Sequence, residues 1–237
     1  MADVKLVNVN KTYMDPERRE LINAVTDFSL DISDGEFITL TGPPECGKTT
    51  LLRLIMGLED PDSGEITVGG QRVKSTGMNP INTGMVFQSG TLYPHMTVYK
   101  NLAFPLKRLR LSKEETERRV LDAARFLQIE ELLKLKPGQL NLEQNQRAAI
   151  ARAMVSQPDV IAMDEPLNRL NDQERSRLRA KLIELRTRRA FTLVYVAYDL
   201  AEAMALGDRV VNMEEGQIVS VRTPEELLKQ MEKPVQG

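Results

Sequence analysis

Residues 42–50, with the sequence GPPECGKTT, constrain this chain more than any other segment, because they form a glycine-bounded turn between a strand and a helix. The preceding EFITL run is short and almost continuously apolar, which predicts a buried strand at 36–40. Apolar residues at helical spacing follow in GKTTLLRLIMGL, so a helix is predicted to begin at the turn. The pattern G-x-x-x-x-G-K-[ST], in which backbone N–H groups surround phosphate oxygens, is matched by Gly42, Gly47, Lys48 and Thr49. The sequence therefore predicts a phosphate-binding loop in which Lys48 neutralises phosphate and Thr49 offers a hydroxyl to Mg²⁺.

The rest of the chain alternates between strand and helix patterns. Antiparallel strands are predicted at 3–9 and 22–32, a hairpin at 64–73 and a strand at 83–88. From 97 to 157 the spacing becomes helical, with segments near 97–107, 112–128 and 143–156 that are broken at Pro105 and at KPG. The last part gives strands in DVIAMDEP, TLVYV, DRVVNM and QIVSV, with helices at 171–189 and 199–206. This order predicts an α/β fold with a mainly parallel sheet, an N-terminal antiparallel part and a helical insertion.

Composition excludes several classes of protein. The 237 residues include 32 Lys and Arg against 34 Asp and Glu, a formal net charge of −2, so we expect no nucleic-acid partner. The apolar runs are far shorter than the roughly 20 residues that cross a bilayer, and the N-terminus has no signal-peptide pattern. A cytoplasmic protein is therefore expected. Cys46 is the only cysteine, which excludes an internal disulfide.

An acidic pair, Asp164 and Glu165, directly follows the predicted strand VIAM. An aspartate at the end of such a strand can hold Mg²⁺, and the glutamate beside it can orient or deprotonate an attacking water. Together with the phosphate-binding loop, the pair predicts a site for a nucleotide and its metal ion.

Several motifs follow one another along the chain in the order of a known family. They are the phosphate-binding loop, VFQSGTLYPHMTVYKNLAFPL at 86–106, QRAAIARAM at 146–154, DEPLNRLN at 164–171 and AEAMALGDRVV at 201–211. With these motifs the chain resembles the ATP-binding subunit of an ABC transporter, of the sugar-importer type related to the maltose transporter. The resemblance implies a P-loop NTPase core with an N-terminal antiparallel β subdomain and an inserted helical subdomain. It implies a single nucleotide-binding domain over 1–237, with the core at about 1–88 and 158–237 and the helical subdomain at about 89–157.

The same resemblance assigns roles to individual positions. Tyr13 would stack on adenine, and Gln88 would touch Mg²⁺ or the attacking water and sense the membrane partner. Glu165 and Gln88 would be catalytic, and Thr49, Gln88 and Asp164 would hold Mg²⁺. The residues expected to bind Mg–ATP are Tyr13, Gly42, Pro43, Pro44, Glu45, Cys46, Gly47, Lys48, Thr49, Thr50, Gln88 and Asp164.

The resemblance also implies partners. Residues 91–106 would border a groove that receives a coupling helix from a transmembrane permease subunit, which would place the chain on the cytoplasmic face of the membrane. A second nucleotide-binding subunit, identical or different, would complete a head-to-tail dimer. Two ATP molecules would lie between the loop of one subunit and the LSGGQ signature of the other.

The sequence departs from the family pattern where that signature is expected. The residues there read LNLEQ: Leu140, Asn141, Leu142, Glu143 and Gln144. Leu142 and Glu143 replace two glycines, so side chains occupy space that backbone and phosphate need. At an effective dielectric constant of 20, like charges 4 Å apart repel by about 4 kcal/mol, and Mg²⁺ and water would reduce this figure.

Other departures concern the loop and the γ-phosphate. Glu45 replaces the usual glycine and Pro44 the usual serine, and a positive φ at 45 would add strain of roughly 1 to 2 kcal/mol. Tyr198 stands at the switch-histidine position, and its phenol, neutral at pH 7, is a poor substitute for imidazole. Asn171 replaces the aspartate that links the two composite sites. We expect the only histidine, His95, to be structural.

The leading hypothesis is an importer subunit that binds Mg–ATP but is strongly impaired in hydrolysis. A working ATPase that tolerates these changes is an alternative. A regulatory protein that only docks on a partner is another, and a soluble ABC protein of DNA repair or translation is a further one. Relatives of this type often carry a regulatory domain after the position where this sequence ends, so a truncated form and a short natural form both remain open.

Overall fold

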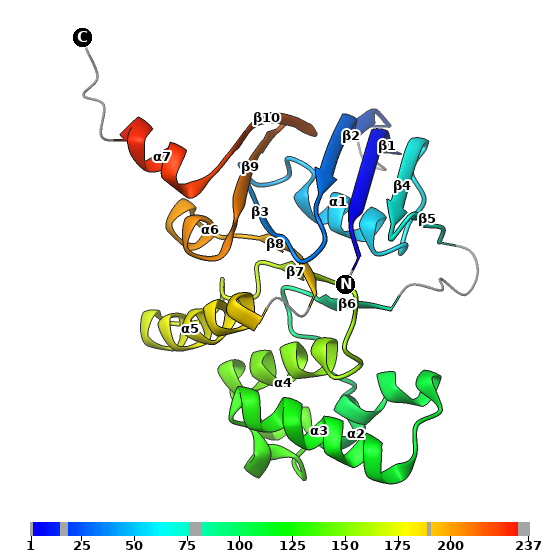
Figure 1. Ribbon diagram of the computed structural model, residues 1–237, viewed down its shortest axis with the longest axis vertical. Coiled ribbons are helices and arrows are strands. Elements are labelled where there is room, and N and C mark those ends of the chain that lie inside the picture. The colour runs from blue at the N-terminus through cyan, green and yellow to red at the C-terminus, as the bar shows by residue number, and fades with distance from the viewer. Residues whose placement is uncertain (1, 15–18, 76–81, 189–190, 232–237) are drawn as a thin grey trace.

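The computed structural model of the chain describes residues 2–14, 19–75, 82–188 and 191–231 (Figure 1). Arg189, the last residue of one predicted helix, lies outside these ranges, as do residues 232–237.

The central sheet has six strands in the order β10–β9–β3–β8–β7–β6. Strand β3 runs parallel to β8 and β9, and β7 runs parallel to β6 and β8, whereas β9 and β10 are antiparallel. The prediction of a mainly parallel sheet is therefore confirmed. The strands are β3 (Phe37–Thr41), β6 (Thr83–Val86), β7 (Val160–Asp164), β8 (Thr192–Val196), β9 (Arg209–Glu214) and β10 (Gln217–Arg222).

A separate antiparallel sheet has the order β2–β1–β4–β5. Its strands are β1 (Val4–Met14), β2 (Leu21–Ile32), β4 (Ser63–Val68) and β5 (Gln71–Arg72). Strand β1 is longer than the predicted span 3–9, because its pairing with β2 continues past register shifts to Tyr13 and Met14. Tyr13 therefore lies within a paired strand, opposite Ile22.

Helix α1 (Lys48–Ile55) packs in the hydrophobic core that joins the two sheets. Successive residues of β3 face opposite sides, as the two-residue period of a strand requires. Ile38 and Leu40 share the core with α1, whereas Phe37 belongs to the core on the other face of the sheet. That second core includes side chains of α5 (Asp172–Arg188) and α6 (Leu200–Leu206).

The predicted helical insertion is present between β6 and β7. It contains α2 (Val98–Ala103), α3 (Lys113–Leu127) and α4 (Leu142–Met154), with short 3₁₀ helices at Pro105–Leu109, Glu130–Leu132 and Pro137–Gln139. Figure 1 shows α2, α3 and α4 gathered beyond the β6 edge of the central sheet. The predicted break of the segment 97–107 at Pro105 is confirmed, because α2 ends at Ala103 and Pro105 begins a 3₁₀ turn. The subdomain boundaries at 89 and 157 stay a proposal.

Helix α7 (Pro224–Met231) was not predicted and follows β10 directly. Among the described residues, no helix combines the length and the apolar character that crossing a membrane requires.

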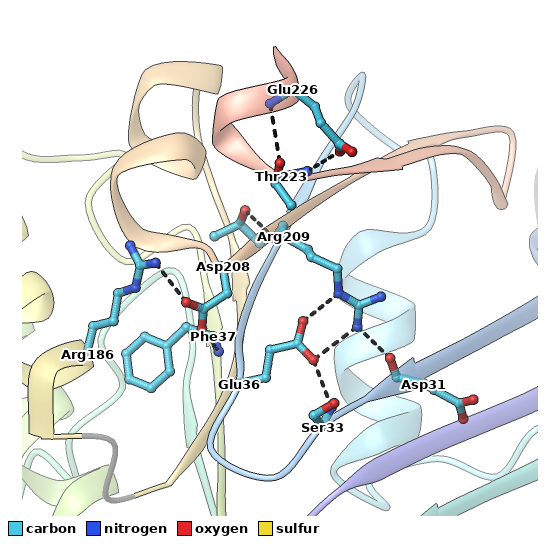
Figure 2. Close-up of polar contacts among 10 residues, drawn as sticks. Asp31, Ser33, Glu36, Phe37, Arg186, Asp208, Arg209, Thr223 and Glu226 are labelled. Carbon is cyan, nitrogen blue, oxygen red and sulfur yellow. Dashed lines mark hydrogen bonds and ion pairs between the residues drawn. The ribbon is translucent and has the colours of Figure 1, made fainter. Parts of the chain in front are cut away.

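A group of ion pairs joins the base of the central sheet to its surroundings (Figure 2). Arg209 of β9 donates to both carboxylate oxygens of Glu36, at 2.6 and 3.0 Å, and to the carbonyl of Asp31 at the end of β2. Beside it, Asp208 accepts from Arg186 of α5 and from the backbone N–H of Phe37. This Arg209 junction holds β2, β3, β9 and α5 together at the end of β3 remote from the phosphate-binding loop.

Candidate functional site

The phosphate-binding loop is wedged between neighbouring backbone segments, which explains its two glycines. Gly42 has φ +142°, and a Cβ added there would lie 2.1 Å from the carbonyl oxygen of Met213. Gly47 has φ +99°, and a Cβ there would lie 1.9 Å from the carbonyl oxygen of Ala24. A side chain at either position would collide with backbone, so the close approach requires glycine.

Glu45 adopts the left-handed conformation, with φ 64°. A non-glycine residue in this region carries strain of about 1 to 2 kcal/mol. Its side chain is exposed, and it lines the cavity described below. The loop therefore keeps its shape at a cost that glycine would not incur.

The ammonium group of Lys48 is buried and bonded to its own loop. It donates to the carbonyls of Gly42 and Pro43, at 2.9 and 2.6 Å, and lies 3.4 Å from the sulfur of Cys46. These contacts hold a positive charge at the centre of the loop, beside the first turn of α1.

Thr49 and Asp164, predicted to share a metal ion, are in direct contact. The Thr49 hydroxyl donates at 3.0 Å to the carboxylate of Asp164, which is the last residue of β7. Burial raises the pKa of Asp164, and this effect outweighs the Thr49 hydrogen bond, which lowers it. A buried carboxylate beside a hydroxyl is an oxygen donor set of the kind that Mg²⁺ prefers, so these residues fit the ion.

Glu165 lies next to this pair and is held by two amides. Its Oε2 accepts from Gln88 at 3.1 Å and from Asn168 at 2.7 Å. Gln88 was predicted to lie here, but Asn168 was not singled out from the sequence. The only available signal was its place three residues after Glu165, in the same turn, where its backbone N–H also donates to the Glu165 carbonyl.

These residues surround a cavity of about 570 Å³, within the range of roughly 300 to 1,000 Å³ for small-molecule sites. Its lining consists of Ala24, Gly42, Pro44, Glu45, Gly47, Lys48, Thr49, Thr50, Gln88, Glu165, Asn168, Ala197 and Tyr198. A smaller cavity of about 220 Å³ between α3 and α5 is mainly apolar and lacks the convergent polar groups that phosphate requires.

Tyr13, the predicted adenine contact, is not among the residues that line the cavity. Its hydroxyl donates to the carboxylate of Glu59. Burial raises the pKa of the Tyr13 phenol, and the Glu59 hydrogen bond raises it further. The ring is thus fixed near α1, and its contact with adenine stays a prediction.

Tyr198 reaches the cavity from the segment between β8 and α6, with 54% of its surface exposed. The guanidinium carbon of Arg175 lies 5.3 Å from the centre of its ring, a distance at which cation–π attraction operates. Arg175 also donates to the carbonyl of Leu170, next to Asn171. The side chain of Asn171 accepts from the backbone N–H of Glu174 in the first turn of α5.

The segment Leu140–Gln144, predicted to stand in place of the signature, leads into helix α4 and does not line the cavity. The Asn141 side chain accepts from the N–H of Gln144, and the Gln144 side chain accepts from the N–H of Asn141, which is a capping box. Glu143 turns along the helix and pairs with Arg147 at 2.5 Å, with both side chains largely buried. The Glu143 carboxylate is therefore compensated within its own helix, and of Leu142 and Glu143 only Leu142 is exposed.

Comparisons with known proteins agree with this geometry. The sequence profile of the family described as ABC transporter matches residues 25–168. The trehalose import ATP-binding protein SugC of Mycobacterium tuberculosis is 45% identical over 227 residues, 96% of this chain and 56% of that protein. The trehalose/maltose import ATP-binding protein MalK of Thermococcus litoralis is 44% identical over 233 residues, 96% of this chain and 61% of that protein.

The chain spans about 56 to 64% of the length of the curated relatives it matches. Among solved structures, the dimeric ATP-binding cassette MJ0796 in a post-hydrolysis state, bound to ADP and Pi, superposes with a TM-score of 0.84 and 31% identity. The match covers 93% of this chain and 98% of that one. With the profile match, this likeness shows that the chain belongs to the ABC transporter family and has the fold of its ATP-binding domain.

Proposed function

We propose that this chain is the ATP-binding subunit of an importer for sugar-type solutes, and that it binds Mg–ATP but hydrolyses it slowly. The single observation that carries the proposal is the cavity in which the phosphate-binding loop, the Thr49–Asp164 pair and the Gln88–Glu165 pair meet. The relatives named for trehalose and maltose import support the solute class.

Each group has a role that follows from its position. The backbone N–H groups of residues 45–50, which follow the two prolines of the loop, and the start of α1 provide an anion site. Lys48 exchanges its two carbonyl acceptors for phosphate oxygens, and Thr49 with Asp164 holds Mg²⁺. When bound, ATP supplies the phosphoryl bond that is cleaved, and Mg²⁺ supplies charge that balances the phosphates. Glu165 orients the attacking water as a hydrogen-bond acceptor.

Slow hydrolysis follows from the groups that surround this centre. Glu45 places a carboxylate and a strained backbone at the cavity. Tyr198 offers a neutral phenol held beside Arg175, where the family pattern has an imidazole. Leu142 exposes a bulky side chain at the start of α4, where the family pattern places glycine against the partner's nucleotide.

A fully active ATPase is the second candidate, and the Glu143–Arg147 ion pair favours it. Because Arg147 compensates the carboxylate, the repulsion expected between the signature segment and phosphate is weaker than the sequence alone indicates. The intact contact between Gln88 and Glu165 favours it as well.

The partners proposed are a transmembrane permease subunit and a second nucleotide-binding subunit, with the chain on the cytoplasmic face of the membrane. Tyr93 and Phe104 support the permease contact, since their exposed rings lie 5.0 Å apart within the segment 91–106. The dimeric MJ0796 cassette supports pairing of two such domains.

Binding and hydrolysis measured side by side test the proposal. The chain is reconstituted with its permease, and a fluorescent ATP analogue and phosphate release are followed in the same preparation. We expect saturable Mg²⁺-dependent binding with turnover well below about 1 s⁻¹, the lower end of typical enzymes. The double variant Glu45→Gly, Tyr198→His is expected to raise turnover without loss of binding.

Other results would favour one of the two alternatives to the proposal. Turnover of the unaltered chain in the usual enzyme range would support the active ATPase, and little gain from the double variant would agree with it. Absence of nucleotide binding would leave a protein that only docks on its partner. Loss of binding in Lys48→Ala is the control that assigns the signal to this cavity.

A further inference from the structure

Asn168 makes the shortest hydrogen bond to the carboxylate of Glu165. Its Nδ2 lies 2.7 Å from Oε2, and the Gln88 amide reaches the same oxygen at 3.1 Å. All three side chains line the cavity that contains the phosphate-binding loop. Both amides therefore donate to the same oxygen of the carboxylate, Oε2.

This one-sided arrangement decides which oxygen can receive a proton or a water. Two N–H donors occupy the two lone pairs of Oε2. The other oxygen, Oε1, has no hydrogen bond from any residue that the structure describes. Because the last side-chain torsion of glutamate is broad and soft, the carboxylate needs such contacts to keep one orientation. With Oε2 held, Oε1 is the oxygen available for a water in the cavity.

The two amides differ in where they are attached. Gln88 follows β6 and leads toward the helical insertion, and we assign it a second task at Mg²⁺. Asn168 lies in the same turn as Glu165, and its backbone N–H donates to the Glu165 carbonyl at 3.2 Å. Glu165 itself has φ 40°, a left-handed conformation stabilised by that turn. Asn168 therefore keeps its contact with Glu165 wherever Gln88 moves.

We propose that Asn168 is a positioning residue that fixes Oε2 of Glu165 and directs Oε1 toward the attacking water. This inference rests on the proposed function of the site as one that binds Mg–ATP and hydrolyses it slowly. Asn168 touches neither the nucleotide nor the reacting atoms in this role. It acts through the orientation of Glu165.

The test uses Asn168→Ala, which removes the donor, and Asn168→Asp, which keeps the shape but replaces the donor with an acceptor. Single-turnover hydrolysis of radiolabelled Mg–ATP is measured with the chain in excess and its permease present. We expect the rate to fall about tenfold in Asn168→Ala, part of the roughly 10² to 10⁴ that a positioned base contributes. Nucleotide affinity should stay within about twofold, because only the chemical step is affected. Asn168→Asp should lose at least as much.

Two further measurements separate positioning from a general structural effect. In a Glu165→Gln background, Asn168→Ala should leave the residual rate unchanged, since the group that it positions is already lost. Crystal structures without nucleotide should show the Glu165 carboxylate in one orientation in the unaltered chain and in more than one in Asn168→Ala. Gln71→Ala, an exposed amide of β5 far from the cavity, is the matched control and should change nothing.

The outcomes are distinguishable from failure of the proposed function. An unchanged rate in Asn168→Asp, or an unchanged Glu165 orientation in Asn168→Ala, would overturn the inference while nucleotide binding stands. A chain that binds Mg–ATP but releases no phosphate in a single turnover would also overturn it. A chain that binds no nucleotide would instead overturn the proposed function, and the crystal structures would still report on the contact.

Discussion

At the scale of single residues, Glu45 is the point at which the phosphate-binding loop departs most from a relaxed conformation. Its φ of 64° costs about 1 to 2 kcal/mol, which a glycine would relieve. A glycine would also lower the stability by roughly 0.5 to 1 kcal/mol, because it makes the unfolded chain more flexible. We therefore predict that Glu45→Gly changes the free energy of unfolding by less than about 1 kcal/mol. It should tighten Mg–ATP binding by about 1 kcal/mol, or fivefold, because a carboxylate leaves the cavity.

Glu45→Gln separates charge from strain, since it keeps the Cβ and removes the charge. Affinity measured by titration calorimetry should rise about as much as in Glu45→Gly, and chemical denaturation should report no gain in stability. If Glu45→Gln binds Mg–ATP no better than the unaltered chain, the charge is not what weakens binding.

Some residues of the site could be placed from the sequence, and others could not. Lys48 and Thr49 could be placed from the sequence, because a strand, a tight turn and a helix fix their positions in any chain with this order. Asp164 could be placed at the carboxyl end of a buried strand, where it meets Thr49. Asn168 could not, because its contact with Glu165 depends on turn geometry and on rotamers that no spacing rule specifies. The i, i+4 spacing of Glu143 and Arg147 was a usable signal for their pairing.

At the scale of elements, helix α4 begins with a complete cap in the segment predicted to stand in place of the signature. Asn141 provides the N-cap, in the capping box with Gln144. Leu142 and Glu143 also favour a helix more than the glycines of the family pattern, by up to about 1 kcal/mol each. Leu142 and Glu143 therefore favour the helix at its first turn, where Leu142 is exposed.

We predict that Asn141→Ala lowers the free energy of unfolding by about 1 kcal/mol, whereas Asn141→Ser is close to neutral. The reason is that serine retains a side-chain oxygen for the Gln144 N–H and alanine does not. Urea denaturation followed by circular dichroism measures both. Ser112→Ala, which removes the corresponding cap of α3, is the matched control and should cost a similar amount. Equal stability of the Ala and Ser variants at 141 would show that the cap contributes nothing.

Helices and strands were predicted correctly where burial produces a clear apolar pattern. They were missed where pairing with another strand, or an exposed position, determines the structure. Strands β7 and β8 were predicted from continuous apolar runs, and every residue of both is buried in the structure. The extension of β1 to Met14 was missed, because it depends on pairing with β2 across bulges. Helix α7 was missed too, since none of its residues is buried.

At the scale of the whole molecule, the Arg209 junction connects the two sheets at the end remote from the cavity (Figure 2). Glu36 is buried, and its carboxylate is bonded to Arg209 and to the N–H of Ser33. The ion pair raises the pKa of Arg209, so the guanidinium stays charged. Loss of Arg209 would leave the buried Glu36 carboxylate with only the Ser33 N–H, which is a costly arrangement for a charge. Loss of the Glu36 charge would leave Arg209 with the Asp31 carbonyl.

We predict that Arg209→Met and Glu36→Gln each lower the free energy of unfolding by about 2 kcal/mol, as expected for a hydrogen bond between charged groups. In the double variant the two losses should be less than additive by about 1 kcal/mol or more. Arg118→Met is the matched control, because Arg118 pairs with Glu115 on the exposed surface of α3, where an ion pair contributes about 1 kcal/mol or less. Guanidinium denaturation measures all four variants. A cost for Arg209→Met no greater than that for Arg118→Met would mean that the sheets are held by their apolar cores alone.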